Sequence, residues 1–162
     1  MKLEQLFVDT LKDIYFAERQ ILKALPKMIK AAHDPRLRQG FEHHLEETHG
    51  QVERLQQVFE AVGKRAQGKT CEAIQGIIEE CEELLDEQRE AGPVRDAGLI
   101  ACGQAVEHYE MSRYGTLIAW AGVLNQKDAA KLLKANLDQE KAADALLSGV
   151  AADINSAAVA IA

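Results

Sequence analysis

Residues 41–53 read FEHHLEETHGQVE, and the interpretation of the rest of the chain starts from this stretch. It holds Glu46 and His49, three positions apart, in what the surrounding pattern predicts to be the middle of a long helix. Residues with this spacing share one helical face, so a carboxylate and an imidazole can reach the same metal region. Alone the pattern is weak, because a glutamate-rich helical sequence produces E-x-x-H by chance. It gains weight only if other helices place carboxylates at the same depth.

The composition is that of one helical globular domain. The chain has 162 residues, which suits a single core, and 47% of them are hydrophobic, which argues against disorder. Only three prolines occur, whereas Ala, Leu, Glu, Gln and Lys are plentiful. That balance favours helix. We therefore expect residues 1–162 to form a single all-α domain.

Charge, hydropathy and cysteine spacing argue against several classes of protein. A formal charge of −7 argues against a general nucleic-acid binder, whose affinity rests largely on Lys and Arg. No uninterrupted apolar run is long enough to span a membrane, and the acidic residues near the N-terminus argue against a signal peptide. Cys71, Cys81 and Cys102 lack C-x-x-C spacing. We expect reduced structural thiols in a cytoplasmic protein, with Cys102 as a small core residue.

Apolar residues three and four positions apart predict four long helices and one short one. Asp34 and Pro35 form a helix start, Gly63 is a helix stop, and Thr70 can cap the short helix. The expected ranges are about 3–32, 35–62, 71–89, 94–124 and 128–152.

The connections predict how these helices are arranged. The short helix lies within a crossover, residues 64–92, whose length lets the long helices on either side run parallel. The loop at residues 125–127 is short, so the helices that it joins should be antiparallel neighbours. The apolar tail after Asp153 could pack on the bundle, pair with another subunit or fray.

Each long helix has carboxylates on or beside its apolar face, close to its midpoint. In the first helix, Glu18 stands between Ile14 and Ile21, where an apolar residue is expected. An unpaired carboxylate at such a position is costly to bury. In a bundle of equal helices the midpoints share one level, so the following residues should converge: Glu18, Glu46, His49, Glu107, Glu110, Glu140 and Asp144.

Such a cluster predicts a metal site. Six carboxylates in a low-dielectric core repel one another and raise their own pKa values. Two divalent metal ions would offset four of the six negative charges. Asp144 and Glu110 are the candidates for the remaining two carboxylates, which would be protonated or would not bind a metal directly. Oxygen-rich ligation with one imidazole suits iron first and manganese second, ahead of zinc or copper.

A simpler interpretation exists for each residue taken singly. One acidic residue on an apolar stripe is usually a partly exposed residue at its edge, and only the coincidence across four helices favours a site. We expect His33, His43 and His44 at the surface. His108 is a candidate partner for a ligand, and Tyr114 is a core residue placed to hydrogen-bond one.

The chain resembles the YciF-type bacterial stress proteins of the ferritin-like superfamily. HLEETHGQ and VEHYE are the most specific of the matching motifs. The resemblance covers nearly the whole chain through LKDIYFAERQILKALPKM, FEHHLEETHGQVERL, GIIEE, VRDAGLIACGQAVEHYEMSRYGTL and NLDQEKAADALL.

This resemblance implies a ferritin-like four-helix bundle with a dinuclear metal site, assembled as a homodimer. Glu110 matches the extra carboxylate of rubrerythrin-like sites. The wider pattern expects E-x-x-H in the last helix, but Ala143 occupies the histidine position and Asp144 follows it. The other ligands carry over to Glu18, Glu46, His49, Glu107 and Glu140.

Two functions are open at this point. The first is a redox-active di-metal protein that binds O₂ or peroxide, with ferroxidase or peroxide-consuming chemistry. In it Glu46, Glu107 or Glu140 bridges the two metals and His49 is a terminal ligand. The second is a non-enzymatic stress protein, with a structural metal site or a bundle that binds a partner.

Overall fold

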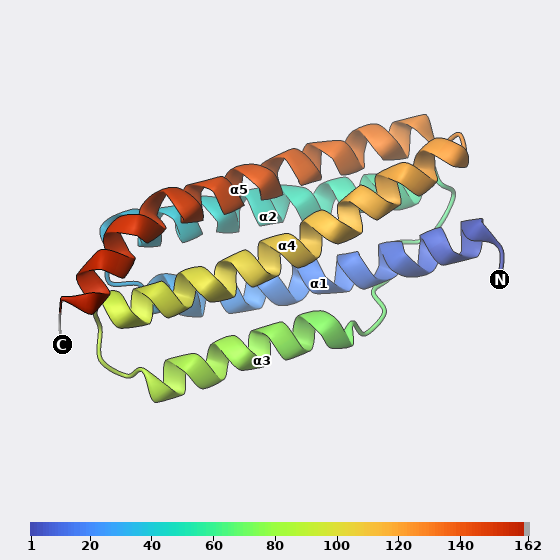
Figure 1. Ribbon diagram of the computed structural model, residues 1–162. Helices are drawn as coiled ribbons and strands as arrows, with labels where there is room; N and C mark the ends of the chain where they lie inside the picture. Colours follow the sequence, from blue (N-terminus) through green and yellow to red (C-terminus); the bar gives the residue numbers. More distant parts are fainter. Residues whose placement is uncertain (161–162) are drawn as a thin grey trace.

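The computed structural model describes residues 1–160, and all the regular structure in that part of the chain is α-helical. Figure 1 shows the helices in chain order. They are α1 (Leu3–Ala31), α2 (Pro35–Ala61), α3 (Glu72–Glu87), α4 (Pro93–Val123) and α5 (Lys127–Val159). The predicted fold, an all-α bundle with a short extra helix in the crossover, is confirmed.

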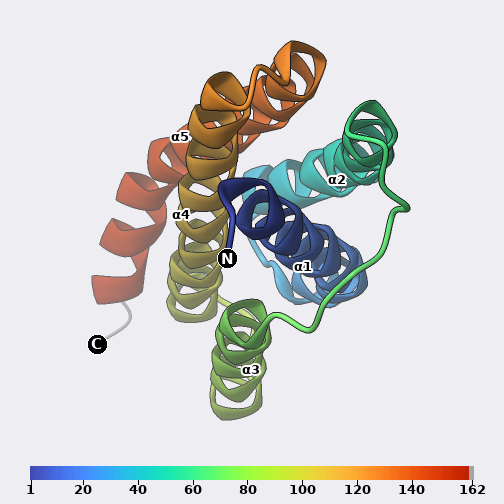
Figure 2. The same ribbon diagram turned by 90° about the vertical axis from the view of Figure 1, so that its right-hand side faces the viewer.

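Four long helices surround the core, and α3 lies outside them. Helix α1 packs on α2 and α4, and α5 packs on the same two helices, so the four form a closed ring. Helix α3 contacts α4 and α1 from outside (Figure 2). Helices α2 and α4 run in the same direction, whereas α5 runs back along α4 (Figure 1). The crossover therefore joins parallel helices, and the short loop joins antiparallel ones, as predicted.

Local sequence signals explain most helix ends. The Asp34 side chain accepts a hydrogen bond of 2.8 Å from the backbone N–H of Arg36, and Pro35 begins α2. Gly63 has a φ of 67°, and the N–H of Lys64 reaches back to the carbonyl of Phe59 at 2.8 Å. This left-handed residue ends α2 as glycine commonly does. The prediction for Thr70 was wrong, because Cys71 is the N-cap of α3 and no side chain caps it.

The last helix is longer than its sequence pattern predicted. Helix α5 continues to Val159 rather than ending near residue 152. Ile154 in this extension is only 3% exposed, and Asp153 pairs with Arg36 of α2 at 2.8 Å. The tail therefore packs on the bundle at Ile154, while Val159 at the end of the helix is exposed. Residues 161–162 lie outside the described part. None of the described helices is long and apolar enough to cross a membrane.

The core is built from apolar stripes and from close approaches between helices. Each residue of the predicted stripe of α1 is buried: Phe7, Leu11, Ile14, Ile21, Leu25 and Met28. Gly103 of α4 faces α5, where an added Cβ would lie 2.9 Å from Leu147 Cδ1 and 3.4 Å from Phe41 Cε1. Gly115 of the same helix is exposed, and an added Cβ would meet nothing within 4 Å. The two glycines of one helix thus differ only in their surroundings.

This difference gives a matched test of the packing. Gly115→Ala should raise the free energy of unfolding by about 0.5–1 kcal/mol, because alanine is the better helix former. Gly103→Ala should lose that gain, because Leu147 and Phe41 must shift to admit the methyl group. Urea unfolding followed by circular dichroism measures both. An equal gain at the two positions would contradict the close approach of α4 to its neighbours.

Candidate metal centre

Four carboxylates meet in the interior of the bundle, at mid-height. Glu18 comes from α1, Glu107 and Glu110 come from α4, and Glu140 comes from α5. Their exposed fractions are 0%, 3%, 0% and 0% in that order. Each occupies a position of its helix that the 3.6-residue repeat turns toward the core. The structure thus brings together four of the seven residues expected from the sequence.

Helix α2 contributes His44, which the sequence interpretation had placed at the surface. His44 is 5% exposed, whereas Glu46 and His49 are both exposed and lie outside the cluster. The expectation that these two residues converge with the others was wrong. At about 100° per residue, Glu46 lies roughly 200° around the helix from His44, and His49 roughly 140°.

A periodic signal for His44 was present in the sequence. The buried face of α2 follows alternating steps of four and three: Leu37, Phe41, His44, Thr48, Gln51 and Leu55. The sequence pattern predicted an apolar stripe that included Leu45 and Val52, with Glu46 and His49 on its flanks. Both Leu45 and Val52 are only half-buried. The rule that singled out Glu18, a polar residue in an apolar series, would have singled out His44 as well.

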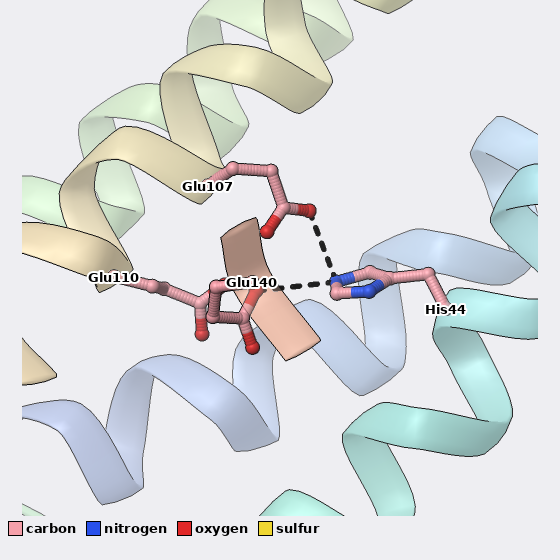
Figure 3. A group of neighbouring side chains, drawn as sticks. All are labelled: His44, Glu107, Glu110 and Glu140. Atoms are coloured by element: carbon pink, nitrogen blue, oxygen red, sulfur yellow. Dashed lines mark ion pairs between the residues drawn. The ribbon is translucent and has the colours of Figure 1, made fainter. Parts of the chain in front are cut away.

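The ligand atoms of the cluster are close enough for one metal ion to contact several of them. One such atom from each of His44, Glu107, Glu110 and Glu140 lies within 4.8 Å of the others. His44 Nε2 is 3.1 Å from Glu107 Oε1 and 3.9 Å from Glu140 Oε2 (Figure 3). On the other side of the ring, Nδ1 is 3.7 Å from Glu47 Oε2. Glu47 therefore faces the far nitrogen of the imidazole, as a carboxylate behind a metal-binding histidine does.

Asp144 lies at the edge of the centre rather than inside it. Its side chain is 22% exposed, and its Oδ1 accepts a hydrogen bond of 3.2 Å from Gln104. His108 Nε2 is 3.1 Å from the same oxygen. His108 is itself exposed, so it contacts the candidate ligand Asp144 but does not reach the buried cluster.

A chain of hydrogen bonds orients Glu18. The Arg54 guanidinium can only donate, so the Asn136 atom that lies 2.6 Å from it is the amide oxygen. The NH₂ group of Asn136 then points to Tyr114 and donates a hydrogen bond of 3.0 Å to its oxygen. The Tyr114 oxygen accepts from that amide, and its O–H donates to Glu18. The expectation that Tyr114 would hydrogen-bond a residue of the cluster is therefore confirmed. Glu18 is held from behind, with its second oxygen free of protein donors within the described residues.

Burial and crowding make these carboxylates hard to ionise. Burial and the nearby Glu140 raise the pKa of Glu18 from 4.5 to about 8. Burial is also the main cause that raises the pKa of Glu107 to about 7 and those of Glu110 and Glu140 well above 4.5. Burial disfavours the charged form of His44, but contacts with Glu47 and Glu140 outweigh it and raise its pKa.

The chemistry of the donor set fits divalent metal ions. Within the described part of the chain, six buried carboxylate oxygens of the cluster have no hydrogen-bond donor: one each of Glu18 and Glu107 and both of Glu110 and Glu140. Buried polar atoms normally have partners. Oxygen donors with an imidazole at this spacing are what a hard or borderline divalent cation requires. The cluster could therefore hold metal.

A small apolar cavity adjoins the cluster. It has a volume of about 30 Å³, and its lining includes His44 and Glu107. Lys27 and Glu82, which are exposed and paired at 2.7 Å between α1 and α3, also line it. The remaining walls are mainly apolar residues of α1, α3 and α4, such as Leu25, Ile78 and Val106. A space of this size holds about one water-sized molecule.

Comparisons with known proteins agree with this fold. The chain is 46% identical over 150 residues to Protein YciF of Escherichia coli strain K12, covering 92% of this chain and 90% of that protein. The crystal structure of the E. coli stress protein YciF matches with a TM-score of 0.91 and 43% identity, over 96% of this chain and 98% of the other. YcfI of Rhodopseudomonas palustris, provisionally described as a structural protein, matches with a TM-score of 0.89 and 49% identity, over 91% and 94%.

The same relationship extends to a family profile. Residues 2–160, nearly the whole chain, match the family described as a domain of unknown function, DUF892. The sequence identity to YciF and the close structural match to its crystal structure point the same way. This chain belongs to the DUF892 family, with YciF-type stress proteins among its relatives.

Proposed function

We propose that the protein is a ferritin-like di-metal carboxylate protein. The observation that carries this proposal is the set of four carboxylates, Glu18, Glu107, Glu110 and Glu140, buried around His44. Four ionised carboxylates carry four negative charges, and two divalent ions carry four positive ones. The charge of a dinuclear site with a neutral His44 therefore balances, whereas a single ion would leave two carboxylates to be protonated or to repel. Asp144 stays a candidate ligand at the rim.

Carboxylate oxygens together with one imidazole suit iron or manganese, and iron is the first candidate because the proposed reaction is a redox reaction. Two such ions, when bound, supply electrons to O₂ or peroxide. The apolar cavity beside His44 and Glu107 suits a small neutral molecule of that kind. The E. coli relative is called a stress protein, and consumption of an oxidant or oxidation of Fe²⁺ as substrate fits such a role.

The residues of the chain would have distinct tasks in this reaction. His44, Glu107, Glu110 and Glu140 bind the metals, and the depth of the cluster excludes bulk water. Tyr114 orients Glu18 by donating a hydrogen bond to one of its carboxylate oxygens. Glu47 places a carboxylate 3.7 Å from the far nitrogen of the imidazole. The homodimer that the family resemblance implies stays a prediction, which light scattering at neutral pH measures.

A structural metal site is the second candidate function. The complete burial of Glu18, Glu110 and Glu140 favours it, because a closed and fully ligated site leaves no position for a substrate. The provisional description of the R. palustris relative as a structural protein also agrees with this alternative. The two candidates differ in whether bound Fe²⁺ reacts with an oxidant.

Reaction of bound iron separates the two candidates. Protein loaded anaerobically with Fe²⁺ and mixed with O₂ or peroxide in a stopped-flow instrument should form Fe³⁺, seen by absorbance, at least about tenfold faster than free Fe²⁺, equivalent to about 1.4 kcal/mol of barrier. The Glu107→Gln variant should lose this acceleration. A rate no faster than that of free iron would overturn the redox function and leave the structural one.

Metal content tests the assignment of the imidazole. His44→Ala should reduce the metal bound after purification by half or more, because it removes the only nitrogen donor in the cluster. His49→Ala, one helical turn and a half away and exposed, is the matched control and should bind normally. Elemental analysis of both variants, with helicity checked by circular dichroism, gives the answer. Reduced metal in the His49 variant alone would restore the assignment made from the sequence.

The pH dependence of stability tests the buried carboxylates in metal-free protein. An unfolded glutamate releases its proton near pH 4.5, whereas folded Glu18 retains its proton up to a pKa of about 8 and Glu107 up to about 7. Between these values the folded state binds more protons at these two groups, so their contribution to stability is greatest below pH 4.5 and falls as the pH rises toward 8. His44, whose pKa is also raised, acts in the same direction.

Chemical denaturation from pH 5 to pH 8 with a chelator present measures this fall. Glu107→Gln should make it shallower, and Glu46→Gln, which changes an exposed residue, should leave it unchanged. Added divalent metal should reverse it, because binding to the folded state requires deprotonated ligands and stabilises that state. A stability that rises steadily over this range without metal would contradict a buried carboxylate cluster.

A further inference from the structure

Two of the three cysteines face each other across the contact between α3 and α4. Cys81 in α3 and Cys102 in α4 are free thiols, close enough that each shifts the pKa of the other. Cys81 is 7% exposed, whereas Cys102 is half-buried and reachable from solvent. Neither belongs to the carboxylate cluster. The sequence interpretation had taken all three cysteines as separate structural thiols, because 21 positions separate these two along the chain.

Two neighbouring contacts fix the register that pairs them. On one side, a Cβ placed on Gly98 would lie 2.6 Å from Leu84 Cδ2, so α3 and α4 approach closely there. Cys81 lies one turn before Leu84 in α3, and Cys102 lies one turn after Gly98 in α4. The helices are antiparallel (Figure 1), so these two turns are opposite each other.

The contact on the far side agrees with this register. Cys71 Sγ lies 2.8 Å from Tyr109 Oη, further along the same pair of antiparallel helices. Cys71 is thereby engaged with a phenol rather than a thiol. The register set by these two contacts therefore places Cys81 opposite Cys102.

We propose that Cys81 and Cys102 are a peroxide-reactive thiol pair that closes to a disulfide between α3 and α4. A disulfide requires a short separation of the two β-carbons, and the close approach of α3 to α4 at Gly98 and Leu84, one turn away, favours such a separation. The oxidant is hydrogen peroxide or an organic hydroperoxide. The pair reacts whether or not the carboxylate cluster holds metal.

The two thiols have different roles in this reaction. Cys102 attacks first, because it is the more exposed and because the hydrogen bond from Cys81 lowers its pKa. The same hydrogen bond, together with burial, raises the pKa of Cys81, which therefore stays protonated until it resolves the intermediate. Reactive cysteines are accessible thiolates, and buried thiols are inert until a partner reacts.

The atoms and electrons of the sequence balance. The Cys102 thiolate attacks one peroxide oxygen, the O–O bond breaks, and the departing hydroxide or alkoxide takes a proton to become water or an alcohol. Cys102 is then a sulfenic acid. The sulfur of Cys81 attacks the sulfur of Cys102, the S–S bond forms, and hydroxide leaves with the Cys81 proton as water. The two thiols give up two electrons in total, which the peroxide accepts.

The disulfide would tie α3 to α4 beside the cavity. Cys81 lines that cavity, and so does His44. Without the disulfide, α3 packs on α1 and α4, and the exposed Lys27–Glu82 ion pair joins it to α1. Oxidation would therefore fix the one helix that lies outside the ring of four.

Peptide mapping of the full-length protein tests the proposal. Reduced protein is treated with a small excess of hydrogen peroxide, with a chelator in one arm, and the remaining thiols are blocked before digestion. The intact mass should fall by two hydrogen atoms, and the Cys81 peptide should be joined to the Cys102 peptide. The melting temperature should rise by about 5 °C, because the bond constrains the unfolded chain. The chelator should change none of this.

Single substitutions assign the roles. Cys71→Ser is the matched control and should still form the disulfide. Cys81→Ser should leave a sulfenic acid on Cys102 that dimedone labels, and Cys102→Ser should react at least about tenfold more slowly with peroxide, as expected when the more accessible thiolate is removed. If either serine variant fails to fold by circular dichroism, the alanine variant replaces it, and the wild-type mapping stands by itself.

Three outcomes would overturn the proposal. They are an absence of the linked peptide after oxidation, a pairing that includes Cys71 in equal yield, and a disulfide that forms only between chains. None of these results bears on the metal centre, since the mapping is made in metal-free protein as well. A failure of the redox function at the carboxylates would likewise leave the thiol result intact.

Discussion

The burial of four carboxylates around one imidazole is the constraint on which the rest of the structure depends. Glu18, Glu107, Glu110 and Glu140 lie where a helical bundle would otherwise place leucine or isoleucine. Burial and mutual repulsion raise their pKa values, so the folded chain must hold protons or cations there. An arrangement that opposes folding in this way suggests a binding centre rather than a stabilising network, as charged clusters in a low-dielectric interior usually do.

The fold supplies the geometry that the centre requires. A crossover between α2 and α4 makes these helices parallel, and each of the four long helices then presents its midpoint to the same level (Figure 1). The surroundings hold the donors in place. Tyr114, Asn136 and Arg54 form a directed chain of hydrogen bonds behind Glu18, and Glu47 lies behind His44. Such outer contacts orient ligands in metal sites.

Helix α3 brings the proposed thiol pair next to the proposed metal centre. It covers one side of the bundle, closes the cavity next to His44 and Glu107, and brings Cys81 to Cys102. Carboxylates that suit redox-active metals and a pair of adjacent thiols are two separate ways of meeting an oxidant. Both are consistent with the stress description of the E. coli relative, and the packing of α3 joins them in space.

The sequence by itself determined the all-α bundle, the crossover with its short helix and four of the five residues at the centre. Apolar periodicity and the caps Asp34 and Gly63 are local signals, and a carboxylate such as Glu18 within an apolar series is visible in a single helix. Tertiary structure decided the rotation of α2 about its axis. Leu45 and His44 both lie near its apolar face, so the local pattern allows either side chain to face the core. It also decided the pairing of Cys81 with Cys102, because contacts between separate helices depend on register, which no local pattern contains.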